Sequence, residues 1–510
     1  MDLPSWDEWI QSVSELPNGK AAGPSVCACF KLQEIPSAWK LANVYPIPKP
    51  KPWGCNLNNT RPITLLETVR KAMVKILNRR LSTVFVQNNV LRGNQFAGLP
   101  HSSTFEPIRI LNDDGNTDPY NVLIGIDQGE VISPLLWCIY YDPLLCEVES
   151  RSLGYNFQTP YKDNIYDLES NIINQQISSM AYMDDTQWLS ESKDNWKKIL
   201  EIADDFYNFT DIQVNKQKSE LLLRIQNPNF QYNDDIQLNF GNQQITIKPV
   251  HPSQSIRILG VWFNMNCSRR FVIDQIREEV LKIEYRSQIT IFNKSESTSV
   301  IAPFRKIFKH KLHLALSIPN AILNNNFIYT FRDLFELQLQ SKISNYNLQV
   351  NSRGLLGVIT DIRIRKLQHL LWLPSSPLLN FPFNKPFSLV VFNFHFRMIL
   401  LCKQFNFSFN INQLKHYTIM GGNIEIRSHI PLPLFIKSLK VLKNRSLMFL
   451  EQITTLDGKS LINWEDLKFR PYSQSMALAL VPSWFNYIKT NSLLPNSLFL
   501  PPELQNFFCS

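Results

Sequence analysis

The stretch QISSMAYMDDTQWLSES (176–192) decides the fold of this chain, because it predicts two short strands joined by an acidic turn. Apolar and polar residues alternate on both sides of the turn. The alternation predicts that four side chains share one side of the pleat: Met180, Tyr182, Thr186 and Trp188. A hairpin of this kind holds its turn at a rigid tip. We therefore expect Asp184 and Asp185 at the tip, with one or both carboxylates pointing outward.

Two adjacent carboxylates at such a tip indicate a possible metal site. Mg²⁺ is a hard cation that takes one or two protein carboxylates and keeps places for water and phosphate. Acidic residues are also favoured in hairpin turns for purely local reasons. Asp184 and Asp185 therefore do not establish a metal site without support from the flanking sequence.

The segments on either side of this hairpin predict two helices. In DQGEVISPLLWCIYYDPLL (127–145), Ser133 is the expected N-cap and Pro134 the first helical residue. Its expected apolar face contains Leu136, Ile139, Tyr140 and Leu144. In DNWKKILEIADDFYNF (194–209), helical spacing directs five residues inward: Trp196, Ile199, Leu200, Ala203 and Phe206. Further along, IRILGVWF (256–263) predicts a single strand.

The earlier part of the chain predicts an extended segment and then a helix. YPIPKPKPW (45–53) contains too many prolines for a helix. ITLLETVRKAMVKILNRRLSTVF (63–85) has an apolar face of Leu66, Val69, Met73, Ile76, Leu77 and Leu81. The opposite face carries Arg70, Lys71, Lys75, Arg79 and Arg80. These cations fit either a solvated face or a surface for an anionic partner.

Composition describes a folded protein with an excess of positive charge. With 510 residues, of which 44% are apolar, the chain can bury substantial cores and form two or three domains. Its 52 Lys and Arg residues against 43 Asp and Glu residues give a net charge of +9. This balance suits a polyanion such as nucleic acid but does not identify one.

Cysteine use and hydropathy indicate where the protein acts. The eight cysteines are scattered, several of them in apolar segments, which predicts reduced thiols and an intracellular protein, in the nucleus or the cytoplasm. Cys27 and Cys29 lack a matching Cys/His pair nearby, which argues against zinc. The most apolar segment, FSLVVFNFHFRMILLC (387–402), is interrupted by polar and charged residues. We therefore expect no membrane span.

Taken together, these motifs occur in the order found in one polymerase family. They are GKAAGP (19–24), IPSAWKLANVYPIPKPKP (35–52), RPITLLETVRK (61–71), NQFAGLPHSST (94–104), QGEVISPLL (128–136), AYMDD (181–185), VNKQKSE (214–220) and ILGVWF (258–263). The series resembles the reverse transcriptases of non-LTR (LINE-like) retrotransposons over about residues 15–265. The resemblance implies RNA-directed DNA polymerisation by a nucleotidyltransferase of a mobile element.

The resemblance also implies roles for residues of the acidic hairpin. Asp184 would be a catalytic metal ligand, with Asp185 as a supporting acid. Tyr182 would lie near the primer end. The implied cofactor is Mg²⁺ or Mn²⁺, and the implied partners are an RNA template, a DNA primer and deoxynucleoside triphosphates.

Five further residues take implied roles outside the hairpin. Gln128 and Gly129 would hold the pair formed by template and nucleotide. Lys49 and Arg61 would contact the template and the triphosphate. Lys218 would protonate the leaving pyrophosphate. For each of these cations, a solvated or structural charge is the alternative interpretation.

One motif of the resemblance is missing. The family would place a strand and a helix, with a third aspartate, between HSSTFEPIRILND (101–113) and GNTDPYNVLIGIDQG (115–129). This chain joins the two segments directly, near Asp113 and Asp114. We therefore expect the palm to lack the strand that carries the first metal ligand.

Asp127 does not fill this gap. It directly precedes the turn formed by Gln128 and Gly129. A carboxylate next to the template-holding glutamine cannot also lie beside Asp184 without moving that turn. We interpret Asp127 as a bystander, and the two acids at the junction as unsupported.

A second shortened segment lies earlier in the chain, between the first two motifs. Only VCAC (26–29) separates NGKAAGPS (18–25) from FKLQEIPSAWK (30–40), where the family has a longer helical spacer. Two losses bounded by intact motifs indicate a damaged copy of the element or wrongly spliced exons.

The expected fold is α+β, a right-hand polymerase with an antiparallel, incomplete palm sheet and a mainly helical thumb and C-terminal region. The expected domains are a shortened N-terminal extension (1–34), fingers and palm (35–265), a thumb-like helical region (266–375) and a C-terminal region of unknown role (376–510). RRFVIDQIREEVLKIEYR (269–286) would begin the thumb, and TDIRIRKLQHLLWL (360–373) predicts a later helix.

Two functions remain open from the sequence. The first is an RNA-directed DNA polymerase of a mobile element, impaired by the missing motif. The second is a non-catalytic remnant that binds nucleic acid through its basic surface. The oligomeric state is not predicted by either.

Overall fold

The computed structural model describes the chain at residues 5, 7–8, 11–12, 43–48, 60–65, 68–95, 131–212, 214, 219–223, 235–240, 243–259, 261–263, 265, 294–324, 334–390, 393–409, 417–469, 480–494, 497 and 499–505. Within these residues, helices are mixed with two-stranded sheets that are mostly antiparallel. This mixture confirms the α+β expectation at the level of class. No helix in the described ranges has the length and apolar composition that crossing a lipid bilayer requires.

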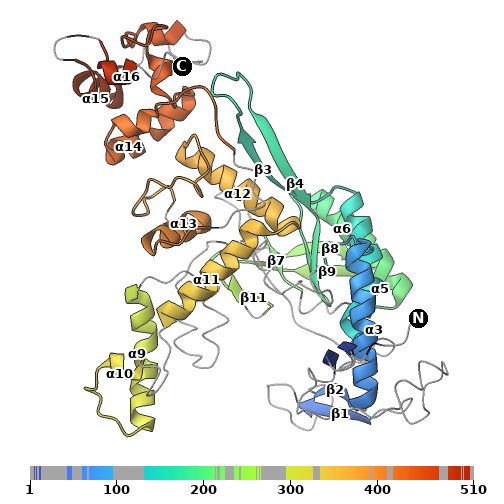
Figure 1. Cartoon of the computed structure of the whole chain (residues 1–510). Helices are drawn as coiled ribbons and strands as arrows, with labels where there is room; N and C mark the ends of the chain where they lie inside the picture. The colour runs from blue at the N-terminus through green and yellow to red at the C-terminus, as the bar shows by residue number, and fades with distance from the viewer. Residues whose placement is uncertain are drawn as a thin grey trace. The chain divides into compact units, whose positions relative to one another are not determined.

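The chain forms two compact units. The first contains Met1–Asn156 and Gln176–Thr290, and the second contains Phe157–Gln175 and Ile291–Ser510. In Figure 1 the helices of the first unit run from blue to green and those of the second from yellow to red. The functional boundaries after 34, 265 and 375 stay predictions.

The first unit begins with the predicted extended segment and helix. Strand β1 (Asn43–Pro48) pairs antiparallel with β2 (Thr60–Leu65), and Ile47 lies opposite Arg61. Helix α3 (Thr68–Gln87) follows. Because each proline lacks an N–H and its ring clashes with the preceding turn of a helix, the segment forms a strand and not a helix.

Both faces of α3 make contacts within the protein. On the predicted apolar face Ile76 is buried and Met73, Leu77 and Leu81 are half-buried, while the side chains of Leu66 and Val69 lie outside the described residues. On the basic face, Arg80 Nη2 lies 2.8 Å from Glu8 Oε2. Hydrogen bonds from Arg80, and then from the Ser5 backbone, lower the pKa of Glu8 to about 2. Part of the basic face therefore serves the protein's own structure.

Helices α5 (Ser133–Ser150) and α6 (Lys193–Thr210) pack together beneath the acidic hairpin. In α6 three of the predicted inward residues, Ile199, Leu200 and Ala203, are buried. The Ser192 side chain accepts a hydrogen bond from the backbone N of Asn195 and caps the helix. Trp196 and Phe206 are partly buried against the same core.

The apolar face predicted for α5 was wrong in part: Leu144 is buried as predicted and Ile139 is half-buried. Leu136 and Tyr140 are 38% and 43% exposed, whereas Leu135, Cys138 and Tyr141 are buried. The sequence of α5 is apolar at adjacent positions, so two faces one residue apart satisfy the helical period, and contact with α6 and the hairpin selects between them. The predicted N-cap was wrong by one residue: the N-cap is Ile132, and the expected cap Ser133 is the first helical residue, before Pro134.

The remaining strands of the first unit form short pairs. Strand β8 (Ile236–Phe240) pairs antiparallel with β9 (Gln243–Ile247), and β7 (Leu221–Leu222) pairs parallel with β10 (Pro249–Val250). The single strand predicted at 256–263 was wrong. The segment forms a hairpin of β11 (Ile256–Ile258) and β12 (Val261–Phe263), since Leu259 has a φ of 45° that turns the chain back.

The second unit is mainly helical in the described residues. Its helices are α9 (Lys294–Lys311), α10 (Asn320–Leu323), α11 (Leu334–Asn351), α12 (Leu355–Leu371), α13 (Phe394–Gln404), η5 (Ile426–His429), α14 (Leu432–Asn444), η6 (Leu450–Ile453), η7 (Asp466–Phe469), α15 (Ser483–Asn491) and α16 (Pro502–Gln505). Helix α12 confirms the helix predicted at 360–373, and Trp372 ends it with a φ of 53°. The predicted thumb helix at 269–286 lies outside the described residues.

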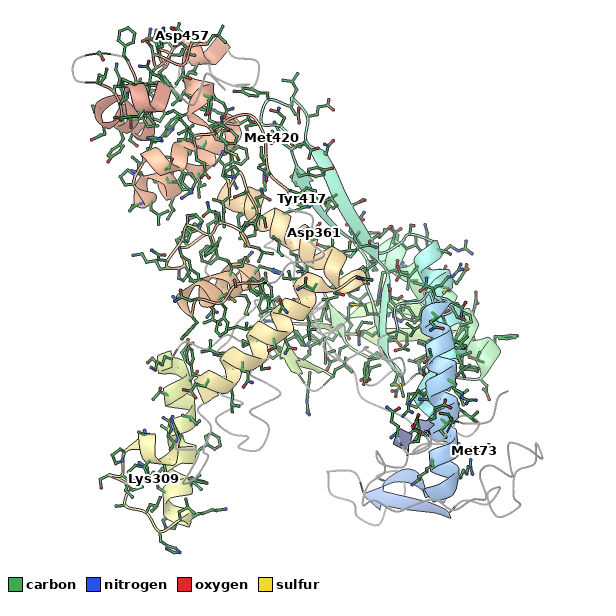
Figure 2. The ribbon with its side chains drawn as sticks, in the orientation of Figure 1. Met73, Lys309, Asp361, Tyr417, Met420 and Asp457 are labelled. Carbon is green, nitrogen blue, oxygen red and sulfur yellow. The ribbon has the colours of Figure 1, made fainter. Side chains whose placement is uncertain are left out.

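A hairpin tip from the middle of the chain completes the core of the second unit. Strands β3 (Tyr155–Tyr161) and β4 (Asn171–Ile177) lead to this tip, where Ile165 is fully buried. The Ile165 backbone N donates to Met420 O at 2.9 Å, and Met420 N donates to Asp163 O at 2.8 Å. Met420 is labelled in Figure 2. These bonds attach segments far apart in the sequence to each other.

Gly421 is required where the hairpin tip meets the second unit. Its φ is 125°, and a Cβ added there would lie 2.4 Å from Ile165 Cγ2. We expect Gly421→Ala to lower the free energy of unfolding of this unit by about 1–3 kcal/mol through strain and overlap. The urea midpoint measures the change. Gly354→Ala is the control, since its Cβ would meet only Ser352 Oγ at 3.9 Å. Equal midpoints for the two variants would contradict the prediction.

Candidate functional site

The acidic stretch forms the predicted hairpin. Strand β5 (Ser179–Tyr182) pairs antiparallel with β6 (Asp185–Trp188), and Tyr182 lies opposite Asp185. Met183 and Asp184 therefore form the turn, with Met183 at a φ of 57°. The Asp184 side chain is exposed at the tip, and that of Asp185 is half-buried.

The predicted distribution of side chains over the two faces was wrong. Cross-strand partners share a face, so Met180 and Tyr182 lie with Gln187 and Asp185. Thr186 and Trp188 lie on the opposite face, with Ala181 and Ser179. The prediction required a three-residue turn, whereas the turn has two residues and shifts β6 by one position.

One face of the hairpin is fixed in the core of the first unit. Ala181 is fully buried among residues of α5 and α6, and Trp188 packs against the same cluster. The Tyr141 hydroxyl, on α5, lies 2.9 Å from Thr186 Oγ1 and also bonds the hydroxyl of Tyr207 on α6. Both helices therefore support the strand that follows the acidic turn.

The side-chain amide of Gln95 holds the turn itself. Its Oε1 accepts a hydrogen bond from Met183 N at 3.0 Å, and its Nε2 donates to Met183 O at 3.3 Å. The backbone N of Ala181 donates to Asn94 O at 2.9 Å, which aligns this segment parallel to β5. The left-handed conformation of Met183, unfavourable for a residue with a side chain, is thus fixed from outside the hairpin.

Two carboxylates of α5 hold the segment Gly93–Gln95 in its place beside the hairpin. Glu149 Oε1 accepts hydrogen bonds from Asn94 Nδ2 at 2.9 Å, from Ser179 N at 2.7 Å and from Ser179 Oγ at 2.8 Å. Asp142 Oδ1 accepts from Gly93 N at 2.7 Å. The helix, the segment and the hairpin therefore form one hydrogen-bonded network.

Gly93 allows the close approach on which this network depends. A Cβ added at Gly93 would lie 2.5 Å from Leu145 Cβ and 2.9 Å from Asp142 Oδ1. Any larger residue would push the segment away from α5. The glycine is therefore needed for space and not for an unusual φ.

The turn offers hard oxygen donors that fit Mg²⁺. Asp184 is exposed and Asp185 is adjacent, which provides the one or two carboxylates that this ion takes from a protein. Within the described ranges, no group of three or more His, Cys, Asp or Glu residues is placed so that it could hold a metal ion by itself. Tyr182 lies half-buried on the same face of the hairpin as Asp185.

Most of the other predicted site residues lie outside the described part of the chain. These are Lys49, Gln128, Gly129 and Lys218, together with Asp113, Asp114 and Asp127. The backbone of Arg61 lies in β2, but its side chain is outside the described residues. The hairpin residues are thus the part of the predicted site whose geometry is known.

Sequence reasoning missed the residues that position the turn. Gln95 lies in the segment NQFAGLPHSST (94–104), which was used only as a family motif. Glu149 and Asp142 are acidic residues in an otherwise apolar helix, and this contrast was the available signal. Their partners are distant in sequence, so the pairing itself carried no pattern.

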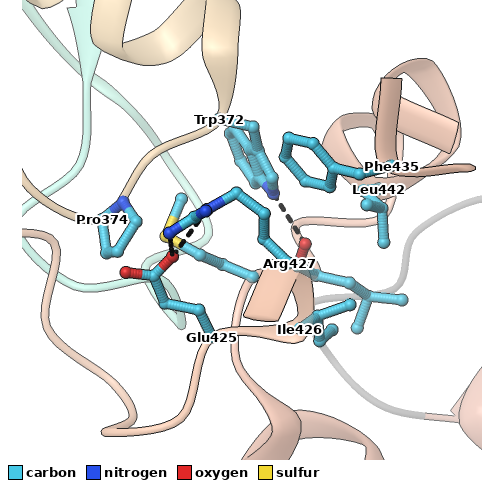
Figure 3. A pocket seen from close by; sticks show the side chains of 9 residues that line it. Trp372, Pro374, Glu425, Ile426, Arg427, Phe435 and Leu442 are labelled. Atoms are coloured by element: carbon cyan, nitrogen blue, oxygen red, sulfur yellow. Dashed lines mark hydrogen bonds and ion pairs between the residues drawn. The ribbon is translucent and has the colours of Figure 1, made fainter. Parts of the chain in front are cut away.

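A pocket in the second unit has no free catalytic group (Figure 3). Trp372, Phe435 and Leu442 are among the residues that line it. The charged residues of its wall pair with each other, Arg427 Nη2 lying 2.8 Å from Glu425 Oε2. The pocket therefore gives no reason to move the candidate site away from the acidic hairpin.

Comparison with known proteins gives one match. The model of a family described as reverse transcriptase (RNA-dependent DNA polymerase) matches residues 109–263. The match includes α5, the acidic hairpin and α6 and ends at the last residue of β12. A search of curated proteins finds no match.

Removal of the Gln95 amide is expected to loosen the acidic turn. Gln95→Ala deletes both bonds to Met183, and we expect a loss of about 1–2 kcal/mol in the free energy of unfolding. Hydrogen exchange in a peptide covering 176–192, measured by mass spectrometry, should become faster. Gln254→Ala removes an exposed amide of the same unit and is the matched control. Equal exchange in the two variants would show that Gln95 does not hold the turn.

Proposed function

From the family match over residues 109–263, we propose that this chain is a reverse transcriptase-like protein of a non-LTR (LINE-like) retrotransposon. The reaction class is nucleotidyl transfer, in which an RNA template directs extension of a DNA primer by deoxynucleoside triphosphates. One observation carries this proposal: the matched residues present Asp184 on a turn that Gln95 and α5 hold rigidly.

A rigid exposed carboxylate suits this chemistry because phosphoryl transfer depends on positioning and charge. Asp184 and Asp185 would hold Mg²⁺ or Mn²⁺. When bound, such an ion stabilises the negative charge of the phosphate oxygens during in-line displacement. The Gln95 amide would keep the Asp184 backbone fixed as substrates enter and leave.

The remaining roles in this proposal come from the resemblance. Tyr182 would lie beside the primer end, and Gln128 with Gly129 would hold the template base. Lys49 and Arg61 would contact the template and the triphosphate. Lys218 would donate a proton to the leaving pyrophosphate, which a variant lacking that amine would test.

We further propose that polymerisation by this chain is impaired. The sequence joins its two flanking motifs near Asp113 and Asp114, where a third aspartate is expected. Without a third carboxylate, the two acids of the turn would bind metal weakly. The genomic DNA across Asn112–Asn116 tests this directly. An in-frame segment that is present in the DNA but missing from this chain would restore the strand and contradict the proposed impairment.

A non-catalytic remnant that binds nucleic acid is the second candidate. The net charge of +9 and the basic face of α3 favour it, because both attract a polyanion without any metal site. Under this alternative the acidic turn is retained by descent only.

Primer extension separates the two candidates. With poly(rA)/oligo(dT) and Mg²⁺ or Mn²⁺, we expect weak incorporation that Asp184→Asn reduces by roughly 100-fold, since several kcal/mol of charge stabilisation depend on that carboxylate. Asp205→Asn, an exposed acid on α6, is the matched control and should leave incorporation unchanged. Salt-sensitive binding of the primer–template by a chain that incorporates nothing would support the remnant instead.

A further inference from the structure

We propose that the second unit carries a binding site for nucleic-acid phosphates, formed by Lys162, His369 and Lys443. The site lies outside the matched residues of the family model except for Lys162. It would give a function to the C-terminal region, for which the sequence suggested none. The proposal does not depend on polymerase activity.

Three elements distant in sequence bring these two lysines and the histidine together. Lys162 directly follows β3, His369 lies in the last turn of α12, and Lys443 lies in the last turn of α14. Lys162 Nζ donates to Asp167 O at 2.5 Å and lies 3.5 Å from Ser446 Oγ, just beyond α14.

The ends of α12 and α14 are also bonded to each other. Trp372 Nε1 donates to Leu447 O at 2.6 Å, and the rings of Trp372 and His369 lie 5.6 Å apart. This contact places the last turn of α12 against the residues that follow α14. The convergence of the two lysines and the histidine is therefore built into the packing of this unit.

Charge and burial at this spot are unfavourable without an anion. Burial, then Lys443 and then Lys162 lower the pKa of His369, so the imidazole is neutral at pH 7 and lies within electrostatic range of both lysines. Burial lowers the pKa of Lys443 to about 8, and burial also lowers the pKa of Lys162 against the attraction of Asp167. Partly buried like charges destabilise each other, and a bound phosphate would reverse that effect.

A structural explanation accounts for only part of the cluster. The helix dipole stabilises a cation in the last turn of a helix. This explains one basic residue at the C-terminal end of α12 and one at the C-terminal end of α14. It does not explain why both ends and Lys162 converge. In the described residues Asp167 is the acid that acts on this group, through Lys162, and no carboxylate hydrogen bond or ion pair to Lys443 is present.

The surroundings favour a polymer of phosphates over a single ion. Lys440 and Lys437 are exposed on α14, one and two turns before Lys443, beside its buried residues Ser438 and Leu439. Residues three positions apart rise by roughly 4.5 Å along a helix, so these lysines extend the positive charge away from the cluster. A nucleic-acid strand offers a matching series of negative charges.

Binding of a short fluorescent single-stranded DNA to the full chain, followed by anisotropy, tests the site. We expect Lys443→Gln to weaken binding roughly three- to tenfold and to lower the slope of log K against log salt by about 0.7, as loss of one phosphate contact requires for a single strand. Lys489→Gln, an exposed cation on α15, is the matched control and should change neither quantity. Identical behaviour of the two variants would overturn the proposal.

Competition identifies the class of ligand. We expect unlabelled DNA to displace the probe at a much lower charge concentration than polyglutamate does. If polyglutamate displaces the probe as well as DNA does, and Lys443→Gln weakens the binding of both competitors equally, the nucleic-acid assignment is overturned in favour of an acidic protein. Primer extension by the same Lys443→Gln chain is measured separately from binding, so loss of polymerase activity and loss of this site are distinguishable.

The pH dependence of binding gives an independent prediction. Lys443 must be protonated to bind phosphate, and its pKa of about 8 means that it loses its charge as the pH rises from 7 to 9. Affinity should fall over this range. Lys443→Arg keeps its charge throughout, so its affinity should fall less. An equal fall in the two chains would contradict the role of Lys443.

Discussion

The Glu149 carboxylate near the end of α5 is the constraint on which the acidic turn depends. It accepts hydrogen bonds from backbone amides where β5 begins and from Asn94. A buried amide without a partner costs about 1–3 kcal/mol, so this carboxylate fixes β5 against the helix. Through Asn94 the same constraint reaches Gln95, whose amide holds the backbone of Met183. The exposure of Asp184 is the result.

The two units use charge in opposite ways. In the first unit, Asp184 stands exposed on a turn held by the neutral amide of Gln95, an arrangement that accepts a cation at little cost in desolvation. In the second, Lys162, His369 and Lys443 converge while partly buried, an arrangement that an anion would stabilise. A protein that handles nucleic acid can use both, because phosphates bind directly to cations and to acids through a metal ion.

Elements with a clear period followed from the sequence, as did the buried face of α6, but the faces of α5 and of the acidic hairpin did not. The helices α3 and α6 and the acidic hairpin formed where spacing and turn residues predicted them. The buried face of α5 was predicted one residue away, because its sequence is apolar on adjacent positions. The segment 256–263 became a hairpin because Leu259 adopts a positive φ, which a β-rich sequence does not reveal.

The sequence by itself determined which segments are helical or extended, and that Asp184 and Asp185 stand together at a turn. These properties depend on neighbours within a few residues. The tertiary structure decided the register of the hairpin, the hydrogen bonds between Gln95 and Met183 across 88 positions, and the meeting of Lys162, His369 and Lys443 from separate elements. Such contacts depend on how distant segments pack, and the free energy of that packing is not expressed in any local pattern of residues.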